Sequence, residues 1–171
     1  MHKRVVFVFR MRGRKMSEIN FYTAGASLAS KTSLGVAELE IIYQLECSGE
    51  VFYNLLADRV GNADAAALLR KNAIEEKGHA RRVARAIEIK LGHEWSPTPD
   101  LEKILDIPLP DTVDAAMFLA VVQGEINGDA GYQMWADAES NEEVARLLRL
   151  NGREETIHAG RAQQVADILA R

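Results

Sequence analysis

Two short stretches of this sequence resemble each other: EEKGH at positions 75–79 and EETIH at positions 154–158. On a helix, residues three apart lie on one face, so Glu76 and His79 point the same way, as do Glu155 and His158. A carboxylate and an imidazole on one face make half of a site for a transition-metal ion. A single pair of this kind is common without any metal, but two copies at a fixed offset indicate a built site.

The two stretches belong to an internal duplication with an offset of 79 residues. Positions 43–87 and 122–166 share 17 identities in 45 positions, so two long segments are repeated, unlike the short period of a solenoid. Upstream of the motifs the offset pairs Glu46 with Glu125. It also pairs Glu50 with Asp129, which is the weaker match.

Composition limits the class of protein. A chain of 171 residues with 47% hydrophobic and 27% charged residues fits one soluble domain with a buried core. The single cysteine, Cys47, excludes a disulfide framework and a cysteine-rich metal site, and it favours a reducing, cytoplasmic location. No apolar run reaches the roughly 18 residues that a membrane span needs. Beyond position 15 the chain has 15 basic and 25 acidic residues, a net charge of −10, which does not fit a nucleic-acid-binding protein.

Residues 1–32 are expected to form an N-terminal extension. Positions 1–15 carry six basic residues and no acid, and VVFVF at positions 5–9 is too short for the core of a signal peptide. We interpret 1–15 as an over-long start, with Met16 opening the native chain; a basic tail or a short strand is the alternative. Positions 16–32 are expected to be an irregular lead-in.

Residues 33–171 are expected to form an all-α four-helix bundle. Apolar residues at helical spacing and good capping residues predict helices over about 33–60, 62–91, 112–139 and 141–170. The short links at Gly61 and Ser140 predict two antiparallel helix pairs. The link over 92–110 holds all four prolines and one possible short helix at 101–105, and it is long enough to cross back along the bundle.

The upstream acids are chosen by the register of these pairs. Residues equidistant from the turn of an antiparallel hairpin lie at one height, and Glu46 and Glu76 are centred on Gly61, as Glu125 and Glu155 are centred on Ser140. Glu50 would miss this level by about one turn. Four buried carboxylates at one level would repel each other and lose their hydration, and two divalent cations would relieve both costs. Mixed carboxylate and imidazole ligands suit iron, manganese or zinc.

One Glu from each of two helices and Glu-x-x-His from each of the other two is the pattern of ferritin-like di-iron proteins. Over residues 33–170 the chain resembles the rubrerythrin-related branch of that superfamily. The resemblance implies a ferritin-like bundle and two iron ions, with manganese or zinc possible in the isolated protein, and it implies bridging roles for Glu76 and Glu155. The implied ligands, which would also be the catalytic residues, are Glu46, Glu76, His79, Glu125, Glu155 and His158.

Six further residues are candidates for assisting roles. Tyr53 and Tyr132 are ordinary core tyrosines, or they donate to a ligand carboxylate or quench radicals beside the metal. Glu75 and Glu154 are exposed charges, or they accept a hydrogen bond from the histidine of the other helix pair. Glu50 and Asp129 are alternative ligands or support for the ligands, or else solvated or capping side chains.

The chain departs from the family pattern in three places. It lacks the two cysteine pairs of the rubredoxin-like site found in full-length rubrerythrins. It has Gly128 where rubrerythrins have an additional glutamate, and it ends without the short fifth helix of the large ferritins. These departures weaken the case for built-in electron delivery and for a 24-subunit cage.

The function expected from the resemblance is that of an oxidoreductase that reduces peroxide or oxygen with electrons from a separate donor protein. The alternatives are a ferroxidase or iron-handling protein, a hydroxylase acting on a lipid or quinone, and a bundle that holds a structural metal. The apolar run at 115–120 fits the hydroxylase, but core packing explains that run equally well. A homo-oligomer, at least a dimer, is expected by the same resemblance.

Overall fold

The computed structural model describes residues 19–171, and within that range it contains five helices and no strand. The helices are α1 Phe21–Leu28, α2 Val36–Arg59, α3 Ala63–Leu91, α4 Ala115–Ala138 and α5 Glu142–Leu169. The prediction of an all-α bundle is confirmed. None of the helices between positions 19 and 171 is both long enough and apolar enough to cross a membrane.

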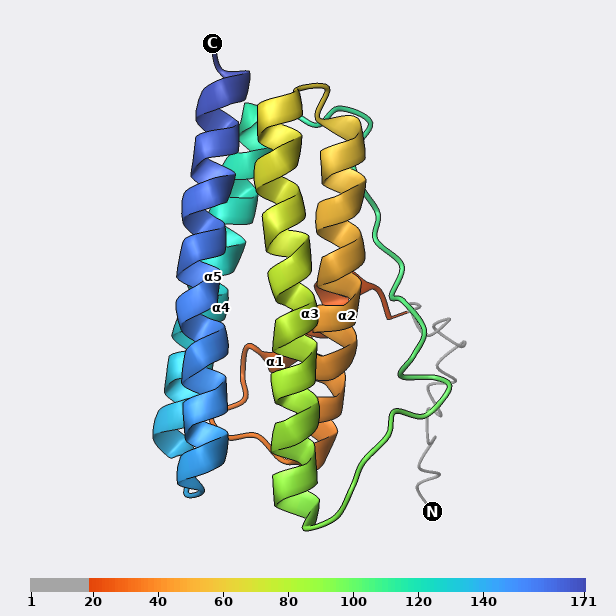
Figure 1. Cartoon of the computed structure of the whole chain (residues 1–171), viewed down its shortest axis with the longest axis vertical. Coiled ribbons are helices and arrows are strands. Elements are labelled where there is room, and N and C mark those ends of the chain that lie inside the picture. The colour runs from red at the N-terminus through yellow and green to blue at the C-terminus, as the bar shows by residue number, and fades with distance from the viewer. Residues whose placement is uncertain (1–18) are drawn as a thin grey trace, which may run out of the picture.

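The four long helices form two antiparallel hairpins, α2 with α3 and α4 with α5 (Figure 1). Helix α3 ends at the foot of the bundle and α4 begins at the opposite end, so the link between them runs back along α2 (Figure 1). The two hairpins meet where α3 packs against α5. In contrast, no Cα atom of α2 lies within 8 Å of one of α4, so the bundle is open along that side.

The helix ends follow from local chemistry that the duplication repeats. Asn62 caps α3 through hydrogen bonds from the backbone N–H groups of Asp64 and Ala65, both 3.0 Å long. Asn141 caps α5 in the same way. Helix α3 ends at Gly92, whose φ of 74° lies in the left-handed region that glycine adopts without steric cost.

The apolar core is divided into two clusters by a layer of buried polar residues. In α2, for example, Leu39 and Ile42 belong to one cluster, Phe52 and Leu56 belong to the other, and Glu46 lies between them. The same order, one cluster, then the polar residues, then the other cluster, holds in the other three long helices. The polar layer is therefore at mid-height in the bundle, as the register of the two hairpins predicts.

Two predictions for the connecting segments are wrong. Residues 21–28 form helix α1, where an irregular lead-in was expected, because Asn20 and Thr23 make a reciprocal capping box that starts a helix. Residues 101–102 form a turn and 103–105 have no regular structure, where a short helix is one possibility from the sequence. Helices α2 and α4 also begin about three residues later than expected, after the capping residues Gly35 and Asp114.

The predictions for residues 1–15 lie outside the described residues.

Candidate metal centre

All six residues selected from the duplication converge at mid-height. Glu46 comes from α2, Glu76 and His79 from α3, Glu125 from α4, and Glu155 and His158 from α5. Both histidines are fully buried, and three of the four glutamates are more than nine-tenths buried. Two groups of candidate donor atoms form, one from Glu46, Glu76 and His79 and the other from Glu76, Glu125, Glu155 and His158, with the atoms of each group within 4.8 Å of one another.

Two of the carboxylates lie between the two imidazoles. The Oε1 and Oε2 atoms of Glu155 lie 3.2 Å from Nδ1 of His79 and of His158, respectively. Glu76 is placed in a similar way. Its Oε1 atom lies 3.2 Å from Nδ1 of His158, and its Oε2 atom lies 3.8 Å from Nδ1 of His79. This arrangement suits carboxylates that bridge two ions.

The other two carboxylates each approach one imidazole. Oε2 of Glu46 lies 3.4 Å from Nδ1 of His79, and Oε2 of Glu125 lies 3.7 Å from Nδ1 of His158. The two imidazole rings stack with centroids 5.2 Å apart and planes 15° apart, so both Nδ1 atoms face the same carboxylate layer. Each hairpin therefore supplies an equivalent set of donor atoms, as the duplication in the sequence predicts.

The Nδ1 atoms of His79 and His158 supply the test of whether these residues fit a metal. Among the described residues, they are the buried side-chain polar atoms without a hydrogen-bond partner. A buried polar atom without a partner costs about 1–3 kcal/mol, and both atoms are aimed at carboxylates that repel one another. Two divalent ions would remove both costs, and the nitrogen and oxygen donors suit iron, manganese or zinc.

The other nitrogen of each ring is held by the opposite hairpin. Nε2 of His79 donates to Glu154 of α5 at 3.0 Å, and Nε2 of His158 donates to Glu75 of α3 at 3.0 Å. This is the cross-hairpin role considered for Glu75 and Glu154. Because a carboxylate only accepts, these bonds place the N–H on Nε2 and leave Nδ1 free for a metal.

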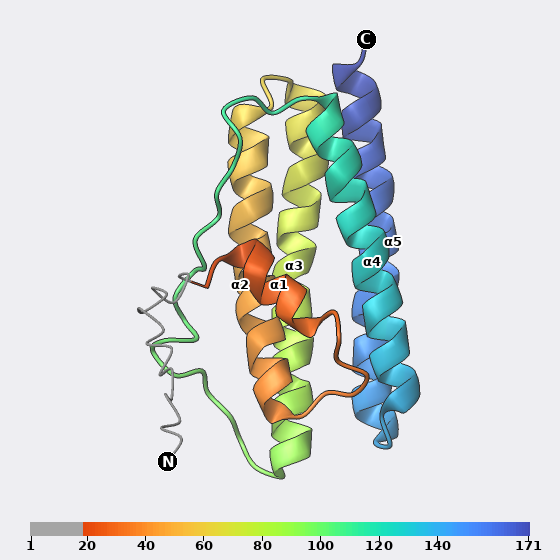
Figure 2. The same ribbon diagram turned by 180° about the vertical axis from the view of Figure 1, so that it is seen from behind.

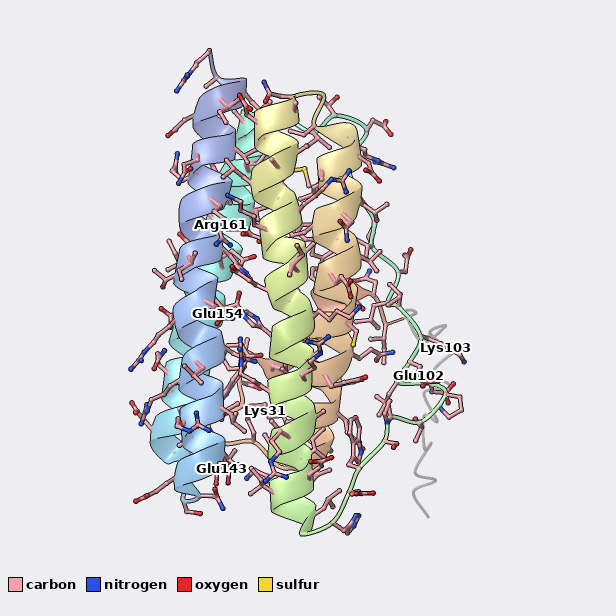
Figure 3. The ribbon with its side chains drawn as sticks, in the orientation of Figure 1. Lys31, Glu102, Lys103, Glu143, Glu154 and Arg161 are labelled. Atoms are coloured by element: carbon pink, nitrogen blue, oxygen red, sulfur yellow. The ribbon has the colours of Figure 1, made fainter. Side chains whose placement is uncertain are left out.

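An arginine and an asparagine also support each histidine, and the sequence motifs gave no indication of these roles. Arg161 donates to Glu75 at 2.6 Å and to Oδ1 of Asn72 at 2.9 Å, and the amide of Asn72 donates to the backbone carbonyl of His158 at 3.3 Å. Arg82, Glu154 and Asn151 repeat the arrangement around His79. Figure 3 shows Glu154 and Arg161 on α5, at its boundary with α3. The signal that could have identified these residues is their identity across the duplication.

The two tyrosines also cross between hairpins. The hydroxyl of Tyr53 on α2 donates to Glu125 on α4, and that of Tyr132 on α4 donates to Glu46 on α2. Burial and the nearby carboxylate charges raise the pKa of both phenols well above the usual value. The phenols therefore remain protonated donors that orient the two outer carboxylates.

In the absence of a metal, burial and the mutual contacts of these residues shift their pKa values in directions that favour protonated imidazoles among the carboxylates. Burial by itself would lower the pKa of each imidazole. The surrounding carboxylates have the larger effect and raise the pKa of His79 to about 11 and that of His158 to about 12. Burial also raises the pKa of Glu76 well above the usual range and that of Glu125 to about 8. Burial acts on Glu155 as well, but the two close imidazoles prevail and hold its pKa below the usual range.

Glu50 and Asp129 have their contacts elsewhere. Glu50 is 3.6 Å from Lys77, and Asp129 accepts from Gln133 at 2.8 Å and from Thr156 at 2.5 Å. The contacts with Lys77 and Thr156 join neighbouring helices, whereas the contact with Gln133 lies within α4. Neither carboxylate belongs to the two groups of candidate metal donors.

Comparison with protein-family models, with curated proteins and with solved structures gives no match for this chain. The residues and their geometry are therefore the basis for the functional assignment.

Proposed function

We propose that this protein is a ferritin-like di-iron oxidoreductase that reduces hydrogen peroxide or oxygen with electrons from a separate donor protein. The observation that carries the proposal is the convergence of four glutamates on two buried imidazoles whose Nδ1 atoms have no partner. The cross-hairpin support of both histidines strengthens it, because outer hydrogen bonds of this kind are typical of metal-bound imidazole.

Under this proposal each residue has a defined task. Glu46 with His79 would hold one ion and Glu125 with His158 the other, and Glu76 and Glu155, which lie near both imidazoles, would be shared by the two. When bound, two ferrous ions supply the two electrons that, with two protons, convert one hydrogen peroxide molecule to two waters. Tyr53 and Tyr132 keep the outer carboxylates oriented, and an apolar cluster lies on either side of the site along the bundle.

The direct test is anaerobic stopped-flow mixing of the Fe(II)-loaded protein with hydrogen peroxide. We expect oxidation of two iron ions per chain at a rate far above that of free Fe(II). The variant His158→Ala should lose the rapid phase, whereas replacement of the exposed His93 by alanine should retain it. Oxidation no faster than that of free Fe(II) would contradict the proposal.

The same samples separate this function from iron storage. After aerobic loading with excess iron, size-exclusion chromatography with iron detection should show about two irons per chain. Retention of many irons per chain in a large assembly would favour the ferritin-like alternative.

A further inference from the structure

A large cavity leads from the surface of the bundle to the carboxylate cluster. Its volume is about 1010 Å³, and it lies along the side where α2 and α4 do not touch. The carboxylates of Glu46, Glu76, Glu125 and Glu155 form its inner end. Helix α1 crosses this side of the bundle (Figure 2), and six residues at positions 21–29 line the cavity.

The walls of this cavity are almost entirely apolar. Ile42, Leu45 and Phe52 of α2 face Met117 and Val121 of α4 across it. Among the residues that line it there is no lysine, arginine or histidine, and the four glutamates are the ionisable carboxylates. With two divalent ions bound, the four negative charges of the glutamates are balanced. The protein walls of the cavity therefore favour an uncharged ligand, because they offer no cationic side chain to an anion.

The cavity exists because α4 has small residues where a bundle helix usually has large ones. Gly124, Gly128 and Gly131 all line it, together with Ala120 and Ala130. A Cβ atom built at Gly124 would meet nothing within 4 Å, so the helix has room there for a side chain that the sequence does not supply. Protein interiors are normally packed to crystal-like density, and this volume lies at the upper end of the range for ligand pockets.

Helix α1 is held in place as the outer wall by four contacts. The ring of Phe21 stacks on Phe52 with centroids 5.3 Å apart, and its backbone N–H donates to the carbonyl of Asp106 at 2.9 Å. The hydroxyl of Tyr22 donates to the carbonyl of Pro108 at 3.1 Å. At the other end, Nε1 of Trp135 donates to the carbonyl of Lys31 at 2.7 Å. The wall is therefore part of the fold.

We propose that this cavity binds an uncharged, largely apolar organic molecule, with one end of the molecule against the carboxylate cluster. The cavity reaches side chains that are more than nine-tenths buried, which suits a small molecule and not the surface of a second protein. Binding follows from the shape and charge of the cavity. Only the position of the molecule beside metal ligands rests on the proposed function.

Two fluorescent probes with one skeleton test the charge and the shape together. N-phenyl-1-naphthylamine is neutral, and 1-anilinonaphthalene-8-sulfonate adds one negative charge to that skeleton. They are titrated into the full-length protein loaded with Zn(II), which has no redox chemistry. We expect saturable binding of one neutral probe per chain and binding of the anionic probe at least tenfold weaker.

Glycine substitutions provide matched variants. Gly124→Leu fills the cavity and should weaken binding of the neutral probe at least tenfold, and Gly25→Leu should do the same from α1, where an added side chain also meets nothing within 4 Å. Gly160→Leu makes the same change at an exposed, open position of α5 outside the cavity and should leave binding intact. The zinc content of each variant confirms that the bundle has formed.

Absence of saturable binding, equal affinity for the two probes, or an equal loss in Gly160→Leu would overturn the proposal. It would also be overturned by a dimer, detected by size exclusion, that excludes the probe until it dissociates, since a second copy would then cover the cavity. Because zinc is redox-inactive, the probe result is independent of peroxide reduction, and either proposal can fail without the other.

Discussion

The two ring nitrogens of each histidine face different carboxylates, and these carboxylates have different roles. Nδ1 of His79 faces Glu46 and Glu155 in the centre, while its Nε2 donates to Glu154. The Nε2 bond fixes the ring orientation, so Nδ1 points toward the centre, where a metal ion would take the place of its proton. Metal affinity should therefore depend on a residue that does not bind the metal.

The first prediction concerns Glu154→Gln and its counterpart Glu75→Gln. Each change weakens the acceptor for one histidine N–H, and we expect metal affinity to fall by about 10–100-fold in either variant. Competition with a coloured chelator measures the affinity. Glu142→Gln, at the exposed start of α5, is the control and should bind metal normally. Unchanged affinity in both test variants would show that the cross-hairpin bonds do not support the site.

The second prediction uses the duplicated pair Gly49 and Gly128. A Cβ at Gly49 would lie 2.8 Å from Oε2 of Glu76 and 3.0 Å from its Cδ, so the carboxylate would have to move out of the cluster. At Gly128 the nearest atom, Cγ of Glu155, would be at 3.6 Å, an ordinary contact. Gly49→Ala should therefore lower the metal content per chain, measured by mass spectrometry. Gly128→Ala should retain full content and gain about 0.5–1 kcal/mol of stability from its helix position. Equal metal loss in both would contradict this explanation.

At the scale of elements, helix α1 is the least firmly attached helix of the described chain. It is eight residues long, and its Cα atoms lie within 8 Å of those of α2 but of no other described helix. A short element with few buried side chains opens more easily than the core helices. Since α1 forms one wall of the cavity, its stability should affect the shape of the cavity.

The third prediction is that Phe21→Ala loosens α1 without unfolding the bundle. Loss of the ring stacked on Phe52 should cost the local structure about 1–2 kcal/mol, equivalent to a five- to thirtyfold faster exchange of the α1 amide hydrogens. Hydrogen exchange read by mass spectrometry should show this over 21–28, with α3 and α5 unchanged. Tyr22→Phe, which removes only one exposed hydrogen bond, is the matched control. Faster exchange throughout α3 and α5 would mean that α1 is part of the global folding unit.

At the scale of the whole molecule, the centre joins two hairpins that otherwise meet mainly along α3 and α5. All four long helices supply donors, so the charge state of the cluster affects the stability of the entire bundle. In the metal-free protein, protons on His79, His158 and Glu125 hold the cluster together.

The fourth prediction is that the metal-free protein loses stability between pH 6 and pH 9. The raised pKa of Glu125, about 8 against an ordinary 4.5, gives stability that is complete below 4.5 and is lost as pH rises through 8. The pKa values of His79 and His158 are also raised, to about 11 and about 12 from an ordinary 6.5. Their contribution to stability is therefore complete below pH 6.5 and declines above it. The lowered pKa of Glu155 gives stability that is already complete above 4.5, so it does not oppose this trend.

Thermal unfolding of the chelator-treated protein at pH 6 and pH 9 measures this dependence. Loading with Zn(II) should raise the Tm and remove most of the decline, because the ions replace the protons and bind only the folded state. The variant His79→Ala, without one of the donors, should show a smaller rise on zinc addition. A metal-free Tm that increases from pH 6 to pH 9 would contradict the assignment of protons to the cluster.

The sequence by itself determined the helical hairpins and the height of the six central residues. The rise of a helix is fixed at 1.5 Å per residue, so the positions of Glu46 and Glu76 relative to the turn at Gly61 set their level before any packing is known. The duplication then repeated that level in the second hairpin. For the same reason, helical spacing along α3 placed Glu76 and His79 on one face.

Only the tertiary structure decided which side chains meet across the two hairpins. The bonds from His79 to Glu154 and from Tyr53 to Glu125, and the clamp of Arg161 on Glu75, depend on how the hairpins are offset and rotated against each other. The open side between α2 and α4 has the same origin, because the width of a gap between helices depends on the packing of all their neighbours. Spacing within one helix carries no information about either. The cross-hairpin bonds of Glu75 and Glu154 were therefore one of two interpretations, and the arginines that hold these glutamates and the cavity were visible only in the folded chain.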